Sequence, residues 1–337
     1  MSRGARRRQR QQPRTLQVFL IIVLVLLTVC VLVKAFFLKA PEQKAAELPA
    51  QSAASDTDSQ QSPEEQAAQE ALRSHLERKG GFYTILLSGL DDDNGGSDTN
   101  ILVAVDTVNG YVYGVSIPRD SKAIIDGKAR KINYAYNKGG TELLADTVSE
   151  QLGIPVDYTV SVNLKGFTAL VDAIGGVDFD VPINMDYDDP IQNLSIHFKK
   201  GVQHLSGADA LRVVRFRHNN DGSGYGSEDL GRMATQQKFL KAVAKKMLSA
   251  GNILTKIDDY AKIFNQYVDT NLTVGNLAWL GTEVLKMGVD KIDFSTLPNA
   301  WKYPYIYLDP TETLTLVNTY LNPYVEDRTA EDLHLPS

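Results

Sequence analysis

The sequence predicts a single α/β domain with a mixed sheet and helices on both faces, preceded by one transmembrane helix. An apolar run lies near the N-terminus, directly after a block of arginines. Segments rich in β-branched and aromatic residues then alternate with segments of helical periodicity. The 43% hydrophobic and 23% charged residues are typical of a folded chain, which excludes a wholly disordered or polytopic membrane protein.

The N-terminal apolar run is predicted to span a membrane. Residues 16–38 are interrupted only by Gln17 and Lys34, and a spanning helix needs about 20 apolar residues. A cleaved signal peptide is the alternative, but it has a shorter apolar core followed by small residues, whereas this run ends in large apolar ones. The arginine-rich tail 1–15 places the N-terminus in the cytoplasm and the body outside the cell, as a single-pass protein of the cell membrane.

Residues 39–81 are predicted to form an extracellular linker and a stalk helix. The segment 41–62 has a single large apolar residue and cannot bury enough surface to fold, which indicates a flexible tether. Ser62 followed by Pro63 is a good helix start, and the glycine pair 80–81 is a helix stop. A longer tether in place of the stalk helix is the alternative.

The predicted domain covers 82–325, and residues 326–337 form a C-terminal tail. Strands are predicted at 82–88, 100–107, 111–117, 158–162, 177–181 and 291–297. Helices are predicted at 141–152, 164–174, 208–214, 228–248, 253–266, 274–287 and 312–321. Asn109-Gly110 is a strong hairpin signal, and a hairpin combined with strands separated by helices predicts a mixed sheet.

Composition excludes several classes of function. The chain has one cysteine, Cys30, so it forms no intramolecular disulfide or cysteine-rich metal site, and its five histidines are scattered. The glycine fingerprint of dehydrogenases, the Walker loop and the nucleophile elbow are absent. Residues 16–337 carry a net charge of −12, which argues against a nucleic-acid binder.

Polar segments interrupt the apolar pattern of the predicted domain. An acidic, glycine-rich loop runs from Asp91 to Asp98; clustered carboxylates suit a hard divalent cation, and a solvated turn is the alternative. Arg119 and Asp120 end the third strand, a common position for site residues, and a surface ion pair is the alternative. Lys131 lies in a Lys-Ile-Asn triplet, which by itself does not indicate a functional site.

A further segment is rich in arginine and leads into the longest predicted helix. If 215–217 is extended, Arg215 and Arg217 point to one face. Arg232 and Gln236 share a helix face because they are four residues apart. The planar guanidinium of arginine donates two hydrogen bonds to phosphate oxygens, and a helix N-terminus adds N–H donors. This group of residues therefore predicts an anion-binding site, with structural ion pairing as the alternative. Together with the acids, it predicts a metal-bridged diphosphate, which outside a cell occurs on lipid carriers.

These segments together resemble the LytR-CpsA-Psr family of bacterial cell-envelope proteins, over about 82–248. The motifs that carry the resemblance are, in order, Gly89-Leu90-Asp91, Ser97-Asp98-Thr99, Ile117-Pro118-Arg119-Asp120, Lys131-Ile132-Asn133, Gly166-Phe167 with Gly175-Gly176-Val177, Arg215-Phe216-Arg217, and Asp229-Leu230-Gly231-Arg232 with Gln236-Gln237. The basic N-terminus and single anchor match the family as well. One departure is Gly96, where the family usually has an arginine before the Ser-Asp-Thr triplet.

The resemblance implies a phosphotransferase that moves an anionic glycopolymer, such as teichoic acid or capsule, from an undecaprenyl-diphosphate carrier onto peptidoglycan. It implies that Asp91 and Asp98 hold Mg²⁺ (or Mn²⁺). It also implies a set of side chains that bind the diphosphate, namely Arg119, Lys131, Arg215, Arg217, Arg232 and Gln236. The polyprenyl chain would enter an apolar tunnel between the sheet and its helices.

The implied reaction breaks the bond between the two phosphates, so negative charge grows on the leaving lipid phosphate. Arginines such as Arg119 and Arg232, with a metal ion, stabilise such charge. A sugar hydroxyl attacks, and its proton acceptor is one of Asp98, Asp120 and Asp229, which the sequence does not separate. Two other functions stay open: a non-catalytic, carrier-binding regulator of envelope assembly, and a diphosphatase that uses water as acceptor.

Overall fold

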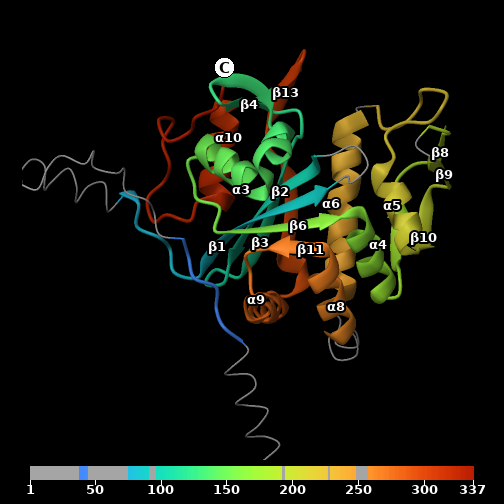
Figure 1. Ribbon diagram of the computed structural model, residues 1–337, viewed down its shortest axis with the longest axis horizontal. Coiled ribbons are helices and arrows are strands. Elements are labelled where there is room, and N and C mark those ends of the chain that lie inside the picture. Colours follow the sequence, from blue (N-terminus) through green and yellow to red (C-terminus); the bar gives the residue numbers. More distant parts are fainter. Residues whose placement is uncertain (1–37, 45–74, 91–95, 192–193, 227, 248–256) are drawn as a thin grey trace, which may run out of the picture.

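A six-stranded mixed sheet forms the centre of the protein in a computed structural model (Figure 1). The structure describes residues 38–44, 75–90, 96–191, 194–226, 228–247 and 257–337. The sheet strands are β1 (Phe82–Leu90), β2 (Ser97–Asp106), β3 (Tyr111–Ile117), β6 (Tyr158–Asn163), β11 (Val268–Thr270) and β12 (Ile292–Thr296). Their spatial order is β11-β6-β1-β2-β3-β12.

Both kinds of strand pairing occur in this sheet. β1 runs antiparallel to β2 and parallel to β6, so that Leu86 lies between Leu102 and Thr159. β2 and β3 form an antiparallel hairpin, and the Asp106 carboxylate accepts the N–H of Asn109 at 2.7 Å in its turn. β12 pairs with β3 in the parallel direction. The predicted mixed sheet and hairpin are therefore confirmed.

Helices cover both faces of the sheet, as predicted. On one face lie α3 (Asn133–Leu152) and α10 (Pro310–Leu316), which continues into a π-helical turn, Val317–Leu321. Their core includes Leu102 and Leu144. On the other face lie α6 (Glu228–Met247) and α9 (Val274–Met287), which pack on the side chains of Ile101, Val103 and Val105. The two cores are separate because successive strand side chains point to opposite faces.

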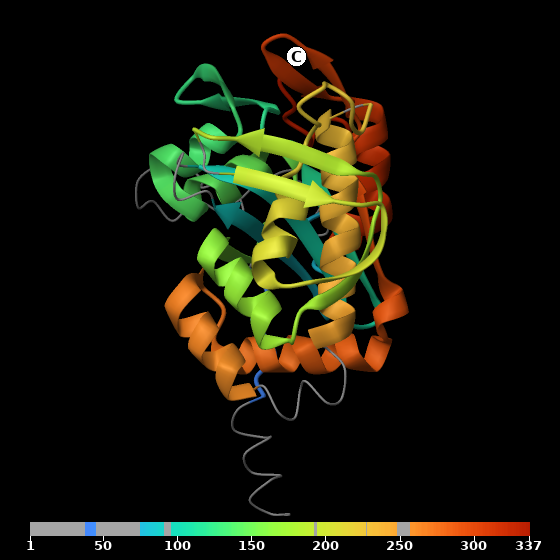
Figure 2. The ribbon, with the colours of Figure 1, turned by 90° about the vertical axis from the view of Figure 1, so that its right-hand side faces the viewer.

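A side layer packs against α6, away from the sheet (Figure 2). It comprises α4 (Leu164–Ala173), β7 (Val177–Val181), β8 (Met185–Asp189), β9 (Leu194–Phe198), β10 (Gly201–Leu205) and α5 (Gly207–Arg215). Phe239 of α6 is fully buried in this layer, whereas its neighbour Leu240 packs on the sheet. The predicted strand 177–181 thus pairs with β10, outside the central sheet.

The remaining elements extend the two ends of the sheet. Two hairpins, β4 (Lys122–Ile125) with β5 (Lys128–Lys131) and β13 (Asn299–Lys302) with β14 (Tyr305–Leu308), lie at one end. α8 (Ile257–Tyr267) and α9 lie at the opposite end, and a 3-10 turn, Val289–Lys291, precedes β12 (Figure 1).

The predicted anchor, stalk helix and tether fall mostly on residues 1–37 and 45–74, which lie outside the described residues. Within the described ranges, no helix is long and apolar enough to cross a membrane. Residues 41–44 differ from the flexible tether predicted for 41–62, since Pro41 is buried and Gln43 makes hydrogen bonds to the domain. The composition of a segment does not reveal such contacts.

Candidate anion-binding site

Figure 1 shows β4 and β13 at one end of the sheet. A polar pocket at this end is lined by residues of β2, β3, α6 and β14. Residues 98–100 at the start of β2 and 116–120 at the end of β3 form one wall. Arg232, Met233 and Gln236 of α6 form another, and Ile306 of β14 closes the rim. The space between these walls is about 370 Å³, part of it open to solvent.

The local sequence explains why β3 stops at this pocket. Pro118 has no backbone N–H and cannot continue the ladder. Its carbonyl accepts the N–H of Ser121 at 3.0 Å, which closes a turn that carries Arg119 and Asp120. On the neighbouring edge, the pairing of β1 with β2 shifts between Gly89 and Leu90. Such irregularities are common at functional rims, where they redirect side chains.

Charges alternate along one wall of the pocket. Arg119 pairs with Asp98, and its Nε lies 3.7 Å from Oδ1 of Asp120. Lys131 at the end of β5 places its Nζ 3.0 Å from the same oxygen. Arg232 adds a third cation beside these two carboxylates. These cations are only partly exposed, and Arg232 is 7% exposed, so an anion bound among them would be weakly screened.

Polar contacts on two sides of α6 fix the position of Arg232. Gln236 Nε2 donates to the carbonyl of Val214 at 3.1 Å, which ties α6 to α5. Gln237 Nε2 lies 2.9 Å from Oγ of Ser116 and 2.7 Å from the carbonyl of Ser295, which ties α6 to β3 and β12.

The loop before α6 also packs closely on its first turns. Burial raises the pKa of Tyr225, whose protonated hydroxyl accepts a 2.9 Å hydrogen bond from Thr235. A Cβ at Gly231 would lie 2.2 Å from that of Tyr225, so only glycine allows this approach. The two contacts hold the loop against the helix one turn from Arg232.

Replacing Gln237 by alanine is expected to lower the free energy of unfolding by about 1–3 kcal/mol, because a buried acceptor loses its donor. The measurement is urea denaturation of the purified protein. Gln266→Ala is the matched control, since Gln266 is an exposed glutamine on α8. Equal stability of the two variants would contradict the tethering role of Gln237.

Most of the predicted site residues gather at this pocket, although their roles stay predictions. Asp98, Arg119, Asp120, Arg232 and Gln236 line it. Lys131 reaches it through the ion pair with Asp120. Asp91 lies in 91–95, outside the described residues, and the side chain of Asp229 in the first turn of α6 is likewise not described.

Two predicted arginines are not among the residues that line the pocket. Arg215 is the last residue of α5, so the extended conformation predicted for 215–217 is wrong at its first position. The predicted helix ends at Val214, whereas the amphipathic pattern of α5 continues through Arg215. Phe216 is 1% exposed, and Arg217 beyond it is exposed.

Other residues that line the pocket were not predicted from the sequence. Ile306 is one example: its N–H donates to the carbonyl of Asp120 at 2.9 Å, but it lies far along the chain in an ordinary apolar strand. Ser116 and Asn100 are others, buried polar residues inside predicted strands. A polar side chain near the end of a predicted apolar strand is the sequence signal that could have identified them.

The position of the missing family arginine has a conformation that favours glycine. Gly96 has φ 105°, and a Cβ there would lie 3.0 Å from Oδ1 of Asn137. Any side chain at this position would therefore be strained.

The described residues contain no group of three or more His, Cys, Asp or Glu side chains arranged to hold a metal ion. The donors at the pocket are nevertheless of the right kind, because Mg²⁺ uses one or two carboxylates and completes its shell with phosphates and water. Asp98 and Asp120 are such carboxylates.

A mixed sheet with a cation-lined pocket at its end defines an α/β protein with a candidate site for oxyanions. The family model of the LytR_cpsA_psr family matches residues 46–321, and the chain belongs to this family. The resemblance inferred from the motifs is thereby confirmed.

Curated relatives carry the name polyisoprenyl-teichoic acid–peptidoglycan teichoic acid transferase. TagV of Bacillus subtilis (strain 168) is 37% identical over 202 residues, 57% of this chain and 50% of the relative. TagU of Bacillus cereus (strain ATCC 14579) is 37% identical over 195 residues, 56% of this chain and 60% of the relative. The chain thus spans about half of the first and three-fifths of the second. The crystal structure of Bacillus subtilis TagV has a TM-score of 0.60 and 32% identity, covering 72% of this chain and 96% of that one.

Proposed function

We propose that this chain is a membrane-anchored phosphotransferase that moves an anionic glycopolymer from a polyprenyl-diphosphate carrier onto peptidoglycan. The observation that carries the proposal is the convergence of Arg119, Lys131 and Arg232 with two carboxylates on one pocket. The names of the relatives support the same reaction class. The anchor at 16–38 and the extracellular placement rest on the sequence alone.

Arg232 has the most direct role in this proposal. Arg232 is a largely buried residue of α6 that lines the pocket, and its guanidinium would hold oxygens of the diphosphate. Negative charge grows on those oxygens as the bond between the phosphates breaks, so the contact strengthens in the transition state. Gln236, one turn further along α6, keeps the helix in place through its bond to Val214.

Arg119 and Asp98 would act as an exchangeable pair. In the structure they neutralise each other. A phosphate oxygen that takes the place of Asp98 on Arg119 would leave the carboxylate available for a metal ion or for the proton of the attacking sugar hydroxyl. A bound Mg²⁺ would supply positive charge to the phosphate oxygens. Lys131 holds Asp120 at the pocket edge, which leaves it less suited to accept a proton.

The proposal is tested by a transfer assay with a short lipid-diphosphate glycan and peptidoglycan fragments, with and without a chelator. Transfer that depends on Mg²⁺ is expected. Asp98→Asn is expected to need at least about tenfold more Mg²⁺ for half-maximal rate, equivalent to 1.36 kcal/mol, because the amide is a poor metal ligand. Thr99→Ser is the control, as it changes the adjacent pocket residue without changing charge.

The same assay separates the alternatives. Release of lipid phosphate without linkage to peptidoglycan would identify a diphosphatase. Carrier binding without turnover would identify a regulator. Full activity of Asp98→Asn at the usual Mg²⁺ concentration would remove Asp98 from the metal site.

A further inference from the structure

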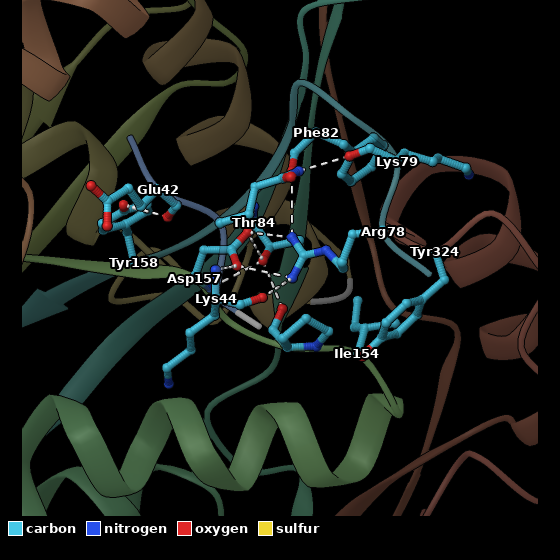
Figure 3. A network of polar contacts seen from close by, with 12 residues as sticks. Glu42, Lys44, Arg78, Lys79, Phe82, Thr84, Ile154, Asp157, Tyr158 and Tyr324 are labelled. Carbon is cyan, nitrogen blue, oxygen red and sulfur yellow. Dashed lines mark hydrogen bonds and ion pairs between the residues drawn. The ribbon is translucent and has the colours of Figure 1, made fainter. Parts of the chain in front are cut away.

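The segment 38–44 is bound to the domain beside the start of β1, the end of that strand away from the pocket. Figure 3 shows Glu42 and Lys44 at this contact. Gln43 Nε2 donates to the carbonyls of Lys79 and Phe82, both at 2.7 Å. The backbone N–H of Lys44 donates to the buried carboxylate of Asp157 at 2.9 Å. These bonds fix the segment at the start of β1.

The first residues of this segment lie against α9. Asn276 Nδ2 donates to the carbonyl of Lys39 at 2.9 Å, and the hydroxyl of Tyr158 donates to the carbonyl of Glu42 at 2.6 Å. Asn276 is itself fixed in the capping box of α9 with Thr273. The residue before Lys39 is the last of the predicted anchor. The predicted anchor would therefore end at the surface of α9.

An apolar stripe runs along the outer face of α9, beside the ion pair of Lys286 with Glu283. Val274, Ala278, Gly281 and Leu285 recur at helical spacing, and their positions share one side of the helix. Val274 is 55% exposed, Leu285 is 39% exposed, Ala278 is exposed, and a Cβ at Gly281 would meet open space. The opposite face of α9 is occupied by the sheet core. A helix on the surface of a soluble domain normally shows polar residues on its outer side.

We propose that α9 is the face of the domain that rests on the lipid bilayer, and that the segment 38–44 holds it there. This inference rests on the membrane anchoring within the proposed function. An apolar outer stripe fits the boundary between headgroups and acyl chains. The exit of the anchor beside Asn276 places that boundary at this helix.

The arrangement sets the height of the pocket. Figures 1 and 2 both show α9 at one end of the domain and the β13–β14 hairpin at the other. β1 runs from Phe82, beside the segment 38–44, to Leu90, near the pocket. Its nine residues span about 26 Å at the usual rise of a strand. The reacting diphosphate would thus lie above the membrane, on the side of the wall, by a distance of this order.

The test uses the full chain with Cys30 replaced by alanine and one new cysteine for a polarity-sensitive fluorophore. Val274→Cys places the label on α9, and Tyr303→Cys, at an 86% exposed position between β13 and β14, is the matched control. The protein is reconstituted into phosphatidylcholine and phosphatidylglycerol vesicles, with or without brominated acyl chains. An interfacial helix buries its apolar face roughly 5–10 Å, so we expect at least about twofold quenching at 274 and none at 303.

A second pair of variants tests the role of the segment 38–44. Lys44→Pro removes the N–H that binds Asp157, whereas Lys44→Ala keeps it. Quenching at 274 is expected to fall in Lys44→Pro and to persist in Lys44→Ala, with melting temperatures recorded for both. Equal quenching in the two would overturn the holding role of the segment.

The remaining outcomes are decisive as well. Vesicle-bound protein with no lipid quenching at 274 would overturn the inference and leave anchoring intact. Blue-shifted emission at 274 that is independent of bromine would indicate a protein partner and would also overturn it. Protein that does not float with vesicles would refute the anchoring and the inference together, while transfer measured in detergent would still test the reaction.

Discussion

Replacing Arg232 by alanine is expected to reduce transfer by about 30- to 900-fold. This range corresponds to about 2–4 kcal/mol for one charge-assisted contact to a developing oxyanion, at 1.36 kcal/mol per tenfold. Arg232 as a residue is 7% exposed and lines the pocket, so water cannot easily replace its guanidinium. The measurement is kcat/KM for the lipid-diphosphate donor, with the melting temperature recorded alongside.

Two further variants make this result interpretable. Arg217→Ala removes an exposed arginine outside the residues that line the pocket, and we expect a much smaller loss from it. Arg232→Lys keeps the charge but loses the planar fork, and an intermediate loss is expected. Loss of transfer in Arg217→Ala that equals the loss in Arg232→Ala would show that the anion site extends beyond this pocket.

Replacing Asp157 by alanine is expected to lower the free energy of unfolding by about 3–5 kcal/mol, because its removal leaves a buried cation uncompensated. The Asp157 side chain is 0% exposed and that of Arg78 is 10% exposed. Arg78 donates to its two oxygens at 2.8 and 3.1 Å, and Thr84 donates its N–H at 2.9 Å (Figure 3). The ion pair joins β1, β6 and the residues before β1.

Chemical denaturation of Asp157→Ala and of Asp180→Ala provides the measurement and its control. Asp180 is an exposed aspartate on β7. Asp157→Asn is expected to lose less stability than Asp157→Ala, since the amide oxygen still accepts hydrogen bonds. If Asp157→Ala unfolds at the same denaturant concentration as Asp180→Ala, the network in Figure 3 does not stabilise the domain.

Local signals in the sequence were sufficient for much of the fold. Asn109-Gly110 located the hairpin between β2 and β3, and Gly153 and Gly175 stand where α3 and α4 end. α3 consists of two helical parts separated by the non-helical Gly139 and Gly140, so the predicted start at 141 matches the second part and the first part, from Asn133, was not predicted. Glycine at a helix break and glycine at a helix end look alike in a sequence.

The site was predictable where its residues are close in sequence. Arg232 and Gln236 are one helical turn apart, and Arg119 follows a strand end, so short patterns predicted their positions. Contacts between distant segments were not predictable. Arg78 lies 79 residues from Asp157 and was assigned to a stalk helix, and Gln43 was assigned to a tether. Only the folded chain brings these partners together.

The position of α6 between two cores has a consequence for how the protein can open. Phe239 belongs to the side layer, and Leu240 belongs to the core under the sheet, while Arg232 extends from the same helix into the pocket. A fluctuation that separates the side layer from α6 exposes Phe239, and one that separates α6 from the sheet removes Arg232 from its place. Local unfolding on either side of this helix therefore disturbs the candidate anion site. The lifetime of the intact pocket is limited by the less stable of the two interfaces of α6, the one with the side layer or the one with the sheet.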